Sequence, residues 1–490
     1  MRASSGVTGL DHILGGGFPY DRVYLVEGDP GSGKTTLGLQ FLREGLRHDE
    51  KVLYVTLSET RSELAAVAES HGWTLDGMAI HELASGDDKA FNPDDQYTFF
   101  HPSEVELGET TKAVLAEVER VNPTRVVFDS LSEMRLLARE PLRYRRQILG
   151  LKQFFTGRRC TVLLLDDRTS HAGDLQLQSL AHGVIALEQL APEYGAERRR
   201  LRVVKLRGVK FQGGFHDFVI STGGLVVFPR LVAADSRTNH EAVTADTGIP
   251  EFNELLGGGL DRGTSTLFIG PAGAGKSALA TQAAASAARR GERVVFYMFD
   301  EGIDTFRRRA AGLGVDIESH VASGQMVLTQ IDPAEMSPGE FADRVRSDVD
   351  RSHASFVVID SLNGYINSMP EERFLLAQLH ELFMFLRQRN ALTISIVAQH
   401  GLIGAMQAPV DLSYLADNVV LLRFFEAAGE VRQAISVLKK RSGPHEKTIR
   451  ELRLQPSGIV VGEPLREFHG VLTGVPNFSP VGVHRPSVQE

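Results

Sequence analysis

Short runs of apolar residues alternate with helical patterns along the chain. The runs are rich in Val, Ile and Leu, and they lack the period-two alternation of a strand with one solvated face. Such runs predict a parallel sheet that is covered by helices on both faces. The predicted strands span residues 23–27, 52–57, 125–128 and 161–165, and then 267–269, 294–299, 356–359 and 393–397. With helical segments such as TTLGLQFLREGLR and SALATQAAASAARR between them, the pattern indicates a doubly wound α/β fold.

The chain also contains an internal repeat of this pattern. TGLDHILGGGFPYDRVYLVEGDPGSGKTT near the start matches TGIPEFNELLGGGLDRGTSTLFIGPAGAGKSA in the middle of the chain. Lys34 and Lys276 are 242 positions apart, and the same spacing separates Glu59 from Glu301. A period of this length is far too long for a solenoid repeat, so it predicts two homologous domains.

The two domains are expected at residues 1–235 and 236–465. Small, polar and charged residues replace the apolar runs in LVAADSRTNHEAVTAD, which predicts a linker there. Each copy ends on two apolar runs joined through a glycine, HDFVISTGGLVVF and TIRELRLQPSGIVVG, and this pattern predicts a C-terminal β-hairpin. Residues 466–490 are expected to form a flexible tail.

Both copies carry a glycine-rich loop of the form G-x4-G-K-[ST] between an apolar strand and a helix. Glycines let backbone amides point at phosphate oxygens, the lysine meets the β and γ phosphates, and the hydroxyl holds Mg²⁺. The motif therefore predicts a triphosphate site in each copy. The residues expected to bind nucleotide are Gly28, Gly31, Ser32, Gly33, Lys34, Thr35 and Thr36 in the first copy, and Gly270, Gly273, Ala274, Gly275, Lys276, Ser277 and Ala278 in the second.

A carboxylate ends one further apolar strand in each copy. VVFDS places Asp129, and VVIDS places Asp360, where a metal-bound triphosphate needs an acidic group, beside the loop hydroxyls Thr35 and Ser277. A solvated aspartate at a strand end is the alternative interpretation.

An acidic residue also follows the second strand of each copy. Glu59 and Glu301 are placed to orient or deprotonate an attacking water, and Asp300 gives the second copy an adjacent carboxylate where the first has Ser58. A carboxylate that only favours a helix start is the alternative.

A basic pair lies near the end of each copy. Lys205 with Arg207, and Lys439 with Arg441, are spaced i, i+2 on a predicted strand, so both charges share one face. In a ring of subunits this face can reach a neighbour's γ-phosphate as an arginine finger. A solvated strand face is the alternative, and ERRRLR from Glu197 is interpreted as a solvated edge strand.

Composition limits the classes of binding partner and the cellular compartment that we expect. The 490 residues include 53 Lys and Arg against 62 Asp and Glu, a net charge of −9, which disfavours a protein that coats phosphate backbones. Cys160 is the single cysteine, so no internal disulfide or multi-cysteine zinc site is expected, and a reducing cytoplasm fits. No run of about 18 apolar residues occurs and no signal core opens the chain, so no membrane segment is expected.

These motifs together resemble the KaiC family. Each copy opens on TG and a glycine run ahead of its phosphate loop, has acidic residues after the second strand, and carries K-x-R near its end. The resemblance covers nearly residues 1 to 465 and implies an α/β protein of two tandem RecA-like P-loop domains. Each domain is then a mostly parallel sheet covered by helices with a C-terminal β-hairpin. One domain alone would also suit RecA or RadA recombinases and replicative helicases, so the tandem arrangement makes the match specific.

The resemblance implies a cytoplasmic homohexameric ATPase that holds ATP and Mg²⁺ between subunits, with signalling partners that the residues do not identify. It also implies that the second domain phosphorylates its own chain, because only Asp300 and Glu301 keep two carboxylates. The segment APVDLSYLADNVVLL resembles the family's phosphorylation loop, and it leaves Ser413 as the acceptor. A loop serine that only caps local backbone is the alternative.

Two other functions remain open on the sequence. A DNA-translocating or strand-exchange motor would need basic or aromatic loops, and QHGLIGAMQAPVDLSY carries no Lys or Arg. A nucleotide-dependent scaffold would keep one domain silent, and Ser58 makes the first copy the better candidate for that role.

Overall fold

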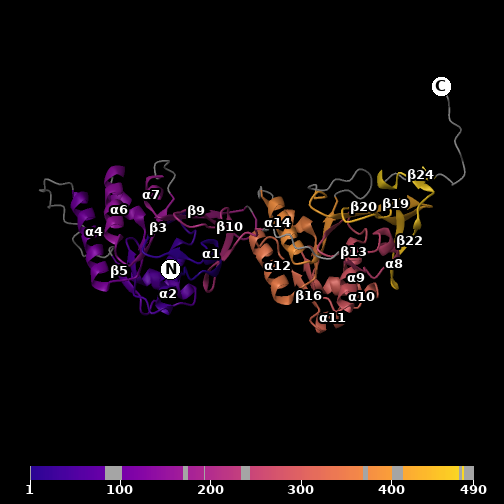
Figure 1. The fold of residues 1–490 in the computed structure, drawn as a ribbon, viewed down its shortest axis with the longest axis horizontal. Helices are drawn as coiled ribbons and strands as arrows, with labels where there is room; N and C mark the ends of the chain where they lie inside the picture. The colour runs from indigo at the N-terminus through magenta and orange to yellow at the C-terminus, as the bar shows by residue number, and fades with distance from the viewer. Residues whose placement is uncertain are drawn as a thin grey trace, which may run out of the picture. The chain divides into compact units, whose positions relative to one another are not determined.

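The structure is a computed structural model that describes residues 2–82, 102–138, 140–168, 175–192, 194–232, 243–367, 374–399, 412–473 and 477–478. Its contacts divide the chain into two compact units, Met1–Arg230 and Leu231–Glu490 (Figure 1). Most of the predicted linker and the tail beyond residue 478 lie outside the described residues. The domain limits at residues 235 and 465 and the flexible tail therefore stay predictions.

The first unit is built around one sheet of nine described strands. From edge to edge they are β5 (Ala79–Glu82), β4 (Val52–Thr56), β6 (Arg125–Asp129), β7 (Thr161–Asp167), β3 (Val23–Gly28), β8 (Gly183–Leu190), β9 (Arg198–Leu206), β10 (His216–Ser221) and β11 (Gly224–Phe228). The strands from β5 to β8 pair in parallel, and β9 to β11 continue the sheet in antiparallel pairs.

The second unit repeats this order. Its described strands are β16 (Met326–Gln330), β15 (Val294–Met298), β17 (Phe356–Asp360), β18 (Leu392–Ala398), β14 (Ser265–Gly270), β19 (Asn418–Ala427), β20 (Glu430–Lys440), β21 (Arg450–Gln455) and β22 (Gly458–Pro464). The change from parallel to antiparallel pairing falls at the same place, between β19 and β20. Short strand pairs lie beside the large sheets: β1 (Arg2–Ala3) with β2 (Phe18–Pro19), β12 (Thr244–Ala245) with β13 (Leu260–Asp261), and β23 (Phe468–His469) with β24 (Asn477–Phe478).

Helices cover both sheets (Figure 1). The first unit has α1 (Thr8–Ile13), α2 (Lys34–Arg47), α3 (Arg61–Ser70), α4 (Pro102–Val121), α5 (Leu131–Ala138), α6 (Pro141–Phe155) and α7 (Leu175–Leu180). The second has α8 (Pro250–Leu255), α9 (Lys276–Arg289), α10 (Ile303–Gly312), α11 (Glu318–Ala322), α12 (Pro338–Ser352), α13 (Leu362–Asn367) and α14 (Leu375–Gln388), followed by a 3₁₀ turn at Val471–Thr473.

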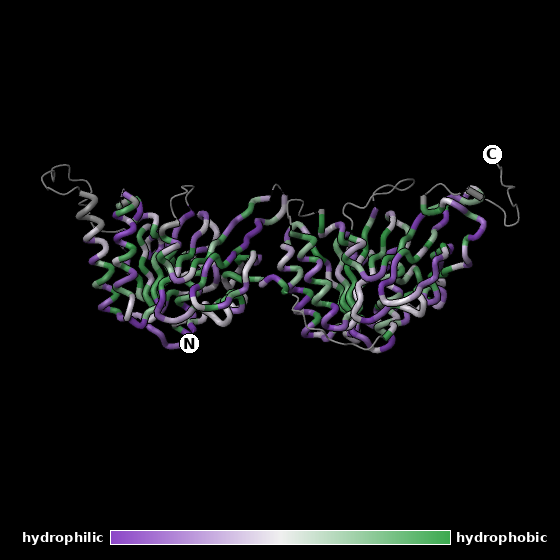
Figure 2. Tube along the Cα trace, turned by 45° about the horizontal axis from the view of Figure 1, so that its top comes forward, coloured by the Kyte–Doolittle hydropathy of each residue, from purple (hydrophilic) through white to green (hydrophobic). Residues whose placement is uncertain are grey.

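The central strands are apolar throughout because both of their faces are buried. In β17, Phe356 and Val358 pack into the core on one face, and Val357 and Ile359 pack into the core on the other. Helix α9 contributes to the first of these cores and α14 to the second. Figure 2 shows the hydrophobic positions, in green, gathered inside each unit. This two-sided burial explains why the sequence shows no period-two alternation.

The predicted fold class is confirmed, and the eight predicted strands and two hairpins form with ends shifted by one or two residues. One prediction was wrong. The ERRRLR segment does not form a sheet edge, because β9 pairs with β8 on one side and with β10 on the other. Its arginines are half-buried, and Arg200 pairs with Glu188 at 2.9 Å. Ion pairs of this kind let a polar run occupy an interior strand.

The C-terminal hairpin of each unit lies against the phosphate loop. A Cβ added at Gly33 would come within 2.7 Å of Ile220 in β10, and one added at Gly275 would come within 3.2 Å of Leu452 in β21. The Gln40 side chain in α2 also bonds both backbone groups of Leu225 in β11, at 2.9 and 3.2 Å. The hairpin therefore fixes the start of the helix that follows each loop.

Candidate active sites at the two phosphate loops

Each glycine-rich loop joins the end of a buried strand to the start of a helix, β3 to α2 and β14 to α9. The last loop residues, Gly33 and Gly275, adopt the left-handed conformation, with φ of 96° and 98°. A residue with a side chain would be strained there, and the turn leaves the first amides of the helix without helical partners. Together with the helix dipole, these amides form an anion site in each unit.

Both loop lysines are buried and curl back over their loops. Lys34 Nζ donates to the carbonyls of Gly28 and Asp29, each at 2.9 Å. Lys276 Nζ donates in the same way to Gly270 and Pro271, at 2.8 and 2.6 Å. Burial lowers the pKa of Lys276 to about 8, although the nearby Asp360 opposes this shift.

Lys34 differs from Lys276 in having a carboxylate partner. Asp167, the last residue of β7, lies 2.8 Å from Lys34 Nζ. Burial raises the pKa of Asp167, but the hydrogen bond and charge of Lys34 outweigh it, so the pKa falls below its ordinary value. The sheet register pairs Gly28 with Asp167 and Gly270 with Ala398, so the second unit has no carboxylate at the matching position.

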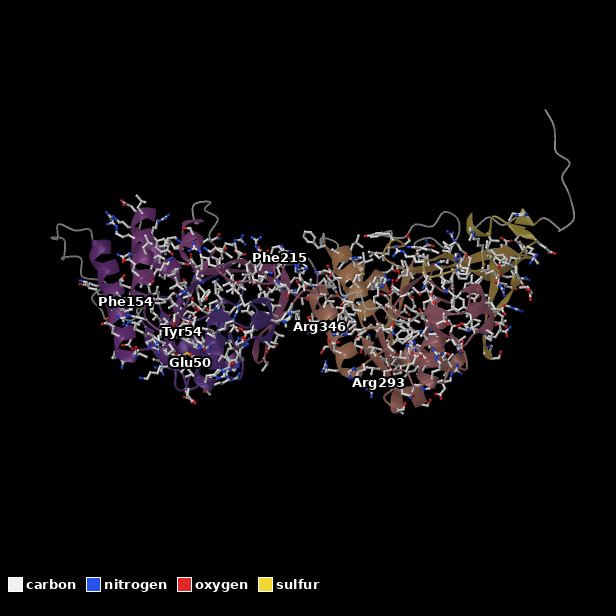
Figure 3. The ribbon with its side chains drawn as sticks, viewed as in Figure 1. Glu50, Tyr54, Phe154, Phe215, Arg293 and Arg346 are labelled. Atoms are coloured by element: carbon white, nitrogen blue, oxygen red, sulfur yellow. The ribbon has the colours of Figure 1, made fainter. Side chains whose placement is uncertain are left out.

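The strand-end aspartate predicted at each site lies beside the loop hydroxyl. Thr35 Oγ1 donates to Asp129 Oδ2 at 2.7 Å, and Tyr54 from the adjacent strand donates to the same oxygen at 2.5 Å. Figure 3 labels Tyr54 in the first unit. Burial raises the pKa of Asp129, and the two hydroxyl bonds partly offset this effect. In the second unit burial raises the pKa of Asp360 to about 6, and a hydrogen bond from Ser277 opposes it.

Glu59 lies in the turn after β4. Its backbone is held by Thr56 Oγ1, which accepts from the Glu59 amide at 2.9 Å and donates to the Glu59 carbonyl at 2.7 Å. Oxygen Oε2 of Glu59 is buried without a hydrogen-bond partner among the described residues. Burial raises the pKa of Glu59, and the charges of Asp129 and Glu63 raise it further. An unsatisfied, basic carboxylate is suited to accept a proton or a hydrogen bond from water.

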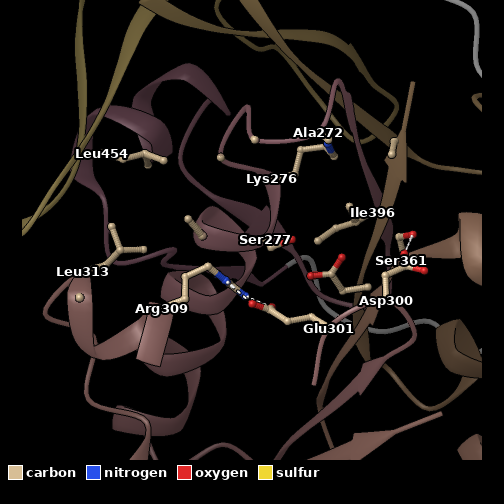
Figure 4. Close-up of a pocket in the computed structure, with 16 residues that line it drawn as sticks. Ala272, Lys276, Ser277, Asp300, Glu301, Arg309, Leu313, Ser361, Ile396 and Leu454 are labelled. Carbon is tan, nitrogen blue, oxygen red and sulfur yellow. Dashed lines mark hydrogen bonds and ion pairs between the residues drawn. The ribbon is translucent and has the colours of Figure 1, made fainter. Parts of the chain in front are cut away.

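In the second unit both adjacent carboxylates have partners. Asp300 accepts a hydrogen bond from Ser361, and Glu301 pairs with Arg309 of α10. All four line a cavity of about 640 Å³ beside the second phosphate loop, together with Lys276 and other loop residues. Figure 4 shows the Glu301 carboxylate turned toward the guanidinium of Arg309.

The basic pairs lie near the starts of the parallel strands, whereas the phosphate loop of their own unit follows the end of a parallel strand. Lys205 pairs with Val184 near the start of β8, whereas the loop follows the end of β3, which runs parallel to β8. Lys439 pairs with Val419 near the start of β19, with the same relation to β14. Because a strand advances about 3.3 Å per residue, this separation keeps both pairs away from a nucleotide on their own loop.

Backbone carbonyls hold these cations in place. Lys205 and Arg207 donate to carbonyls near the end of α7. Lys439 Nζ donates to the Ser413 carbonyl at 2.8 Å, and Arg441 donates to the next carbonyl at 2.9 Å. The half-buried Ser413 therefore belongs to the same cluster as the second basic pair. The loop before it, residues 400–411, lies outside the described residues.

Three residues of the sites were missed by the sequence analysis. Tyr54 is one of several aromatic residues in buried strands, so its hydroxyl bond to Asp129 has no sequence signal. Asp167 ends the run VLLLDD, and its place after an apolar strand matches that of Asp129. Arg309 is one of three consecutive arginines, and only the helix geometry selects it.

The residues at both sites fit a nucleotide and a magnesium ion. Mg²⁺ prefers oxygen ligands and binds through one or two carboxylates together with substrate phosphates. A hydroxyl and a buried carboxylate at hydrogen-bond distance, as in Thr35 and Asp129, supply this donor set. Thr36 is a weaker candidate for a side-chain contact, because its hydroxyl bonds His71 at 3.2 Å.

These features define a tandem P-loop nucleoside triphosphatase. The sequence model described as "ATPase: KaiC" matches residues 3–232 and 245–466. The chain therefore belongs to the KaiC ATPase family, as the sequence motifs predicted, and its activity is that of an ATPase. This result does not favour the DNA-motor alternative.

Curated relatives extend over nearly the whole chain. The circadian clock protein KaiC3 of Synechocystis sp. is 25% identical over 487 residues, which cover 98% of this chain and 95% of that protein. The circadian clock oscillator protein KaiC of Parasynechococcus marenigrum is 24% identical, with 97% and 93% covered. That of Picosynechococcus sp. is 25% identical, with 96% and 91% covered. Among the described residues, no helix has the length and apolarity that crossing a membrane requires.

Proposed function

We propose that this chain binds ATP with Mg²⁺ at both phosphate loops and hydrolyses it between the subunits of a homohexameric ring. The observation that carries the proposal is the duplicated set of a buried lysine, a loop hydroxyl and a strand-end aspartate. In the first unit the hydroxyl and the aspartate are 2.7 Å apart. Little rearrangement is needed to complete such a site, which favours binding.

Each residue of the set has a distinct role. Lys34 and Lys276 exchange their carbonyl partners for phosphate oxygens, and the loop amides bind the same oxygens. Thr35 with Asp129, and Ser277 with Asp360, hold the magnesium ion. When bound, Mg²⁺ neutralises charge that develops on the phosphates. Glu59 and Glu301 orient the attacking water and accept its proton.

The basic pairs act on the neighbouring subunit. Arg207 and Arg441, with Lys205 and Lys439, are too far from their own loops, so they complete the site of the adjacent chain by stabilising transition-state charge. Mixing two inactive variants tests this role. In Lys34→Ala protein, whose first site is inactive, the further changes Arg441→Ala and Lys276→Ala are each expected to abolish turnover. Mixed rings regain it, because an intact loop then meets an intact arginine, whereas failure to complement would contradict action in trans.

The second domain is proposed to phosphorylate its own chain on Ser413. The hydrogen bond from Lys439 to the Ser413 carbonyl supports this role. If Lys439 lies near the phosphate of the neighbouring subunit, as proposed above, Ser413 lies near that phosphate too. Incubation with γ-labelled ATP followed by mass spectrometry is expected to place label on Ser413. Ser413→Ala should abolish the label, whereas the matched control Tyr414→Phe should keep it. Phosphate release without any label would leave a plain ATPase.

The biological role is proposed from the relatives. Their names describe circadian clock proteins, which supports a cytoplasmic regulatory protein whose conformation follows nucleotide turnover and whose signalling partners are proteins. Partner capture from extract, with ATP or ADP bound, tests whether any interaction depends on the nucleotide. An interaction that ignores the nucleotide would contradict this role.

Phosphate release from single-site variants tests the central activity. Lys34→Ala should leave only second-site turnover, and Lys276→Ala only first-site turnover, with ring assembly checked by sizing in the same buffer. Loss of all turnover with either change alone would contradict two working sites. No loss with both changes would contradict hydrolysis at these loops.

A further inference from the structure

The glutamate of the second site is held by a two-point ion pair. Arg309 Nη2 lies 2.8 Å from Glu301 Oε2, and Nε lies 3.2 Å from Oε1, so each carboxylate oxygen takes one N–H bond. Both side chains are about three-quarters buried. Arg309 is itself fixed, since Nη1 lies 3.5 Å from Thr281 Oγ1 of α9 and the guanidinium lies 5.2 Å from the Phe306 ring centre.

In the part of the first unit that the structure describes, the glutamate has no such restraint. Helices α3 and α10 are both 10 residues long, and they begin two residues after Glu59 and Glu301 respectively. Arg309 is the seventh residue of α10, and the seventh residue of α3 is Val67. Val67 packs against the hydrophobic core, and oxygen Oε2 of Glu59 is buried without a partner among the described residues. The same backbone thus carries a paired glutamate in one unit and an unpaired one in the other.

A paired carboxylate is a poor partner for an attacking water. The guanidinium N–H groups occupy the oxygens that would accept the hydrogen bond from water, and the fixed fork geometry keeps the carboxylate turned toward α10 (Figure 4). The neighbouring carboxylates also have hydroxyl partners. Asp300 accepts from Ser361, and Asp360 accepts from Ser277.

We propose that Arg309 is a positioning residue that withdraws Glu301 from the water, so that opening of this ion pair limits turnover at the second site. The proposal rests on the hydrolytic role proposed for Glu301. It reverses the expectation that Ser58 makes the first site the silent one, because the first site holds the unrestrained glutamate. Arg309 acts through Glu301.

The test uses Lys34→Ala protein, in which only the second site turns over. Arg309→Val, which copies the first unit, is expected to raise kcat about fivefold with KM unchanged, as expected for losing a partly exposed ion pair. Arg309→Lys, which keeps the charge but not the fork, should lie between the two. Adding Glu301→Gln should remove the gain. Arg308→Val is the matched control, because Arg308 is exposed on the same helix, and it should leave kcat unchanged.

A second readout is independent of turnover. Without nucleotide, carbodiimide labelling of Glu301, followed by mass spectrometry, should be faster in Arg309→Val than in the parent protein. The reciprocal change, Val67→Arg in Lys276→Ala protein, should slow first-site turnover by placing a guanidinium beside Glu59. Thermal unfolding of each variant shows whether the fold is retained.

The outcomes separate this inference from the proposed function. A parent protein without turnover contradicts hydrolysis at the second site, whatever Arg309 does. A working parent whose kcat falls or stays unchanged in a folded Arg309→Val variant contradicts the restraint and makes Arg309 an anchor or a bystander. Unchanged labelling of Glu301 likewise overturns the proposal.

Discussion

The two units share one scaffold but place charge differently around the phosphate loop. In the first, Lys34 has a carboxylate partner in Asp167, and oxygen Oε2 of Glu59 has no hydrogen-bond partner among the described residues. In the second, the Lys276 ammonium donates to the carbonyls of Gly270 and Pro271, while Glu301 is paired with Arg309. The restraint thus lies on the phosphate-binding cation in one unit and on the water-binding carboxylate in the other. The two copies thus share the phosphate loop and differ in the ion pairs around it.

A second difference lies at the start of β6, whose other end carries Asp129 of the first site. Arg125 begins β6 and is almost fully buried, where it forms two hydrogen bonds to Glu50 at 2.7 and 3.0 Å and two to backbone carbonyls. The first residue of the matching strand β17 is Phe356. Burial raises the pKa of Glu50, but the hydrogen bond and charge of Arg125 outweigh it, so the pKa is lowered. An ionic contact in one copy thus occupies the place of an apolar one in the other.

Breaking this buried pair should change stability strongly. Arg125→Ala should lower the free energy of unfolding of the first unit by about 3 to 5 kcal/mol, because it leaves Glu50 without its partner. The single tryptophan, Trp73, is buried in the first unit, so its fluorescence during urea unfolding reports that unit alone. The control is Arg290→Ala in the second unit, which pairs with Glu292. An Arg125 variant as stable as the parent would mean that the pair contributes nothing.

The second expected effect is a pH dependence of ATP binding at the second site. The pKa of Lys276 is lowered to about 8 by burial, so the free protein loses this positive charge as pH rises through 8. Bound phosphates favour the charged lysine, so the apparent affinity should fall about tenfold per pH unit above 8. Titration of Lys34→Ala protein with ATP at pH 7, 8 and 9 measures it. A constant affinity over this range would contradict a neutral lysine in the free site.

A smaller effect tests the carboxylate beside Lys34. Asp167→Ala in Lys276→Ala protein should tighten ATP binding at the first site about fivefold, because the phosphates no longer compete with a partly exposed ion pair. The reciprocal Ala398→Asp, in Lys34→Ala protein, should weaken the second site. Equilibrium binding of a fluorescent ATP analogue measures both. Weaker binding by the Asp167 variant would show that this carboxylate helps to hold the nucleotide.

Much of this arrangement was predictable from the sequence because it depends on local pattern. Apolar runs specify buried strands, and the loop motif specifies its own backbone, so the strands and both P-loops follow from the letters alone. Arg309 and Asp167 could not be assigned in this way, since their roles arise from contacts across separate elements. The ERRRLR strand was misjudged for the same reason, because Glu188 and β10 lie outside the segment.

We propose that one chain carries two nucleotide sites. Equilibrium dialysis or native mass spectrometry with ATP and Mg²⁺ measures the number bound per chain most directly. We predict two ATP per chain for the parent protein, one for Lys34→Ala or Lys276→Ala, and none for the double variant. A folded parent that binds no nucleotide, or a double variant that still binds two, would show that the two phosphate loops are not the nucleotide sites.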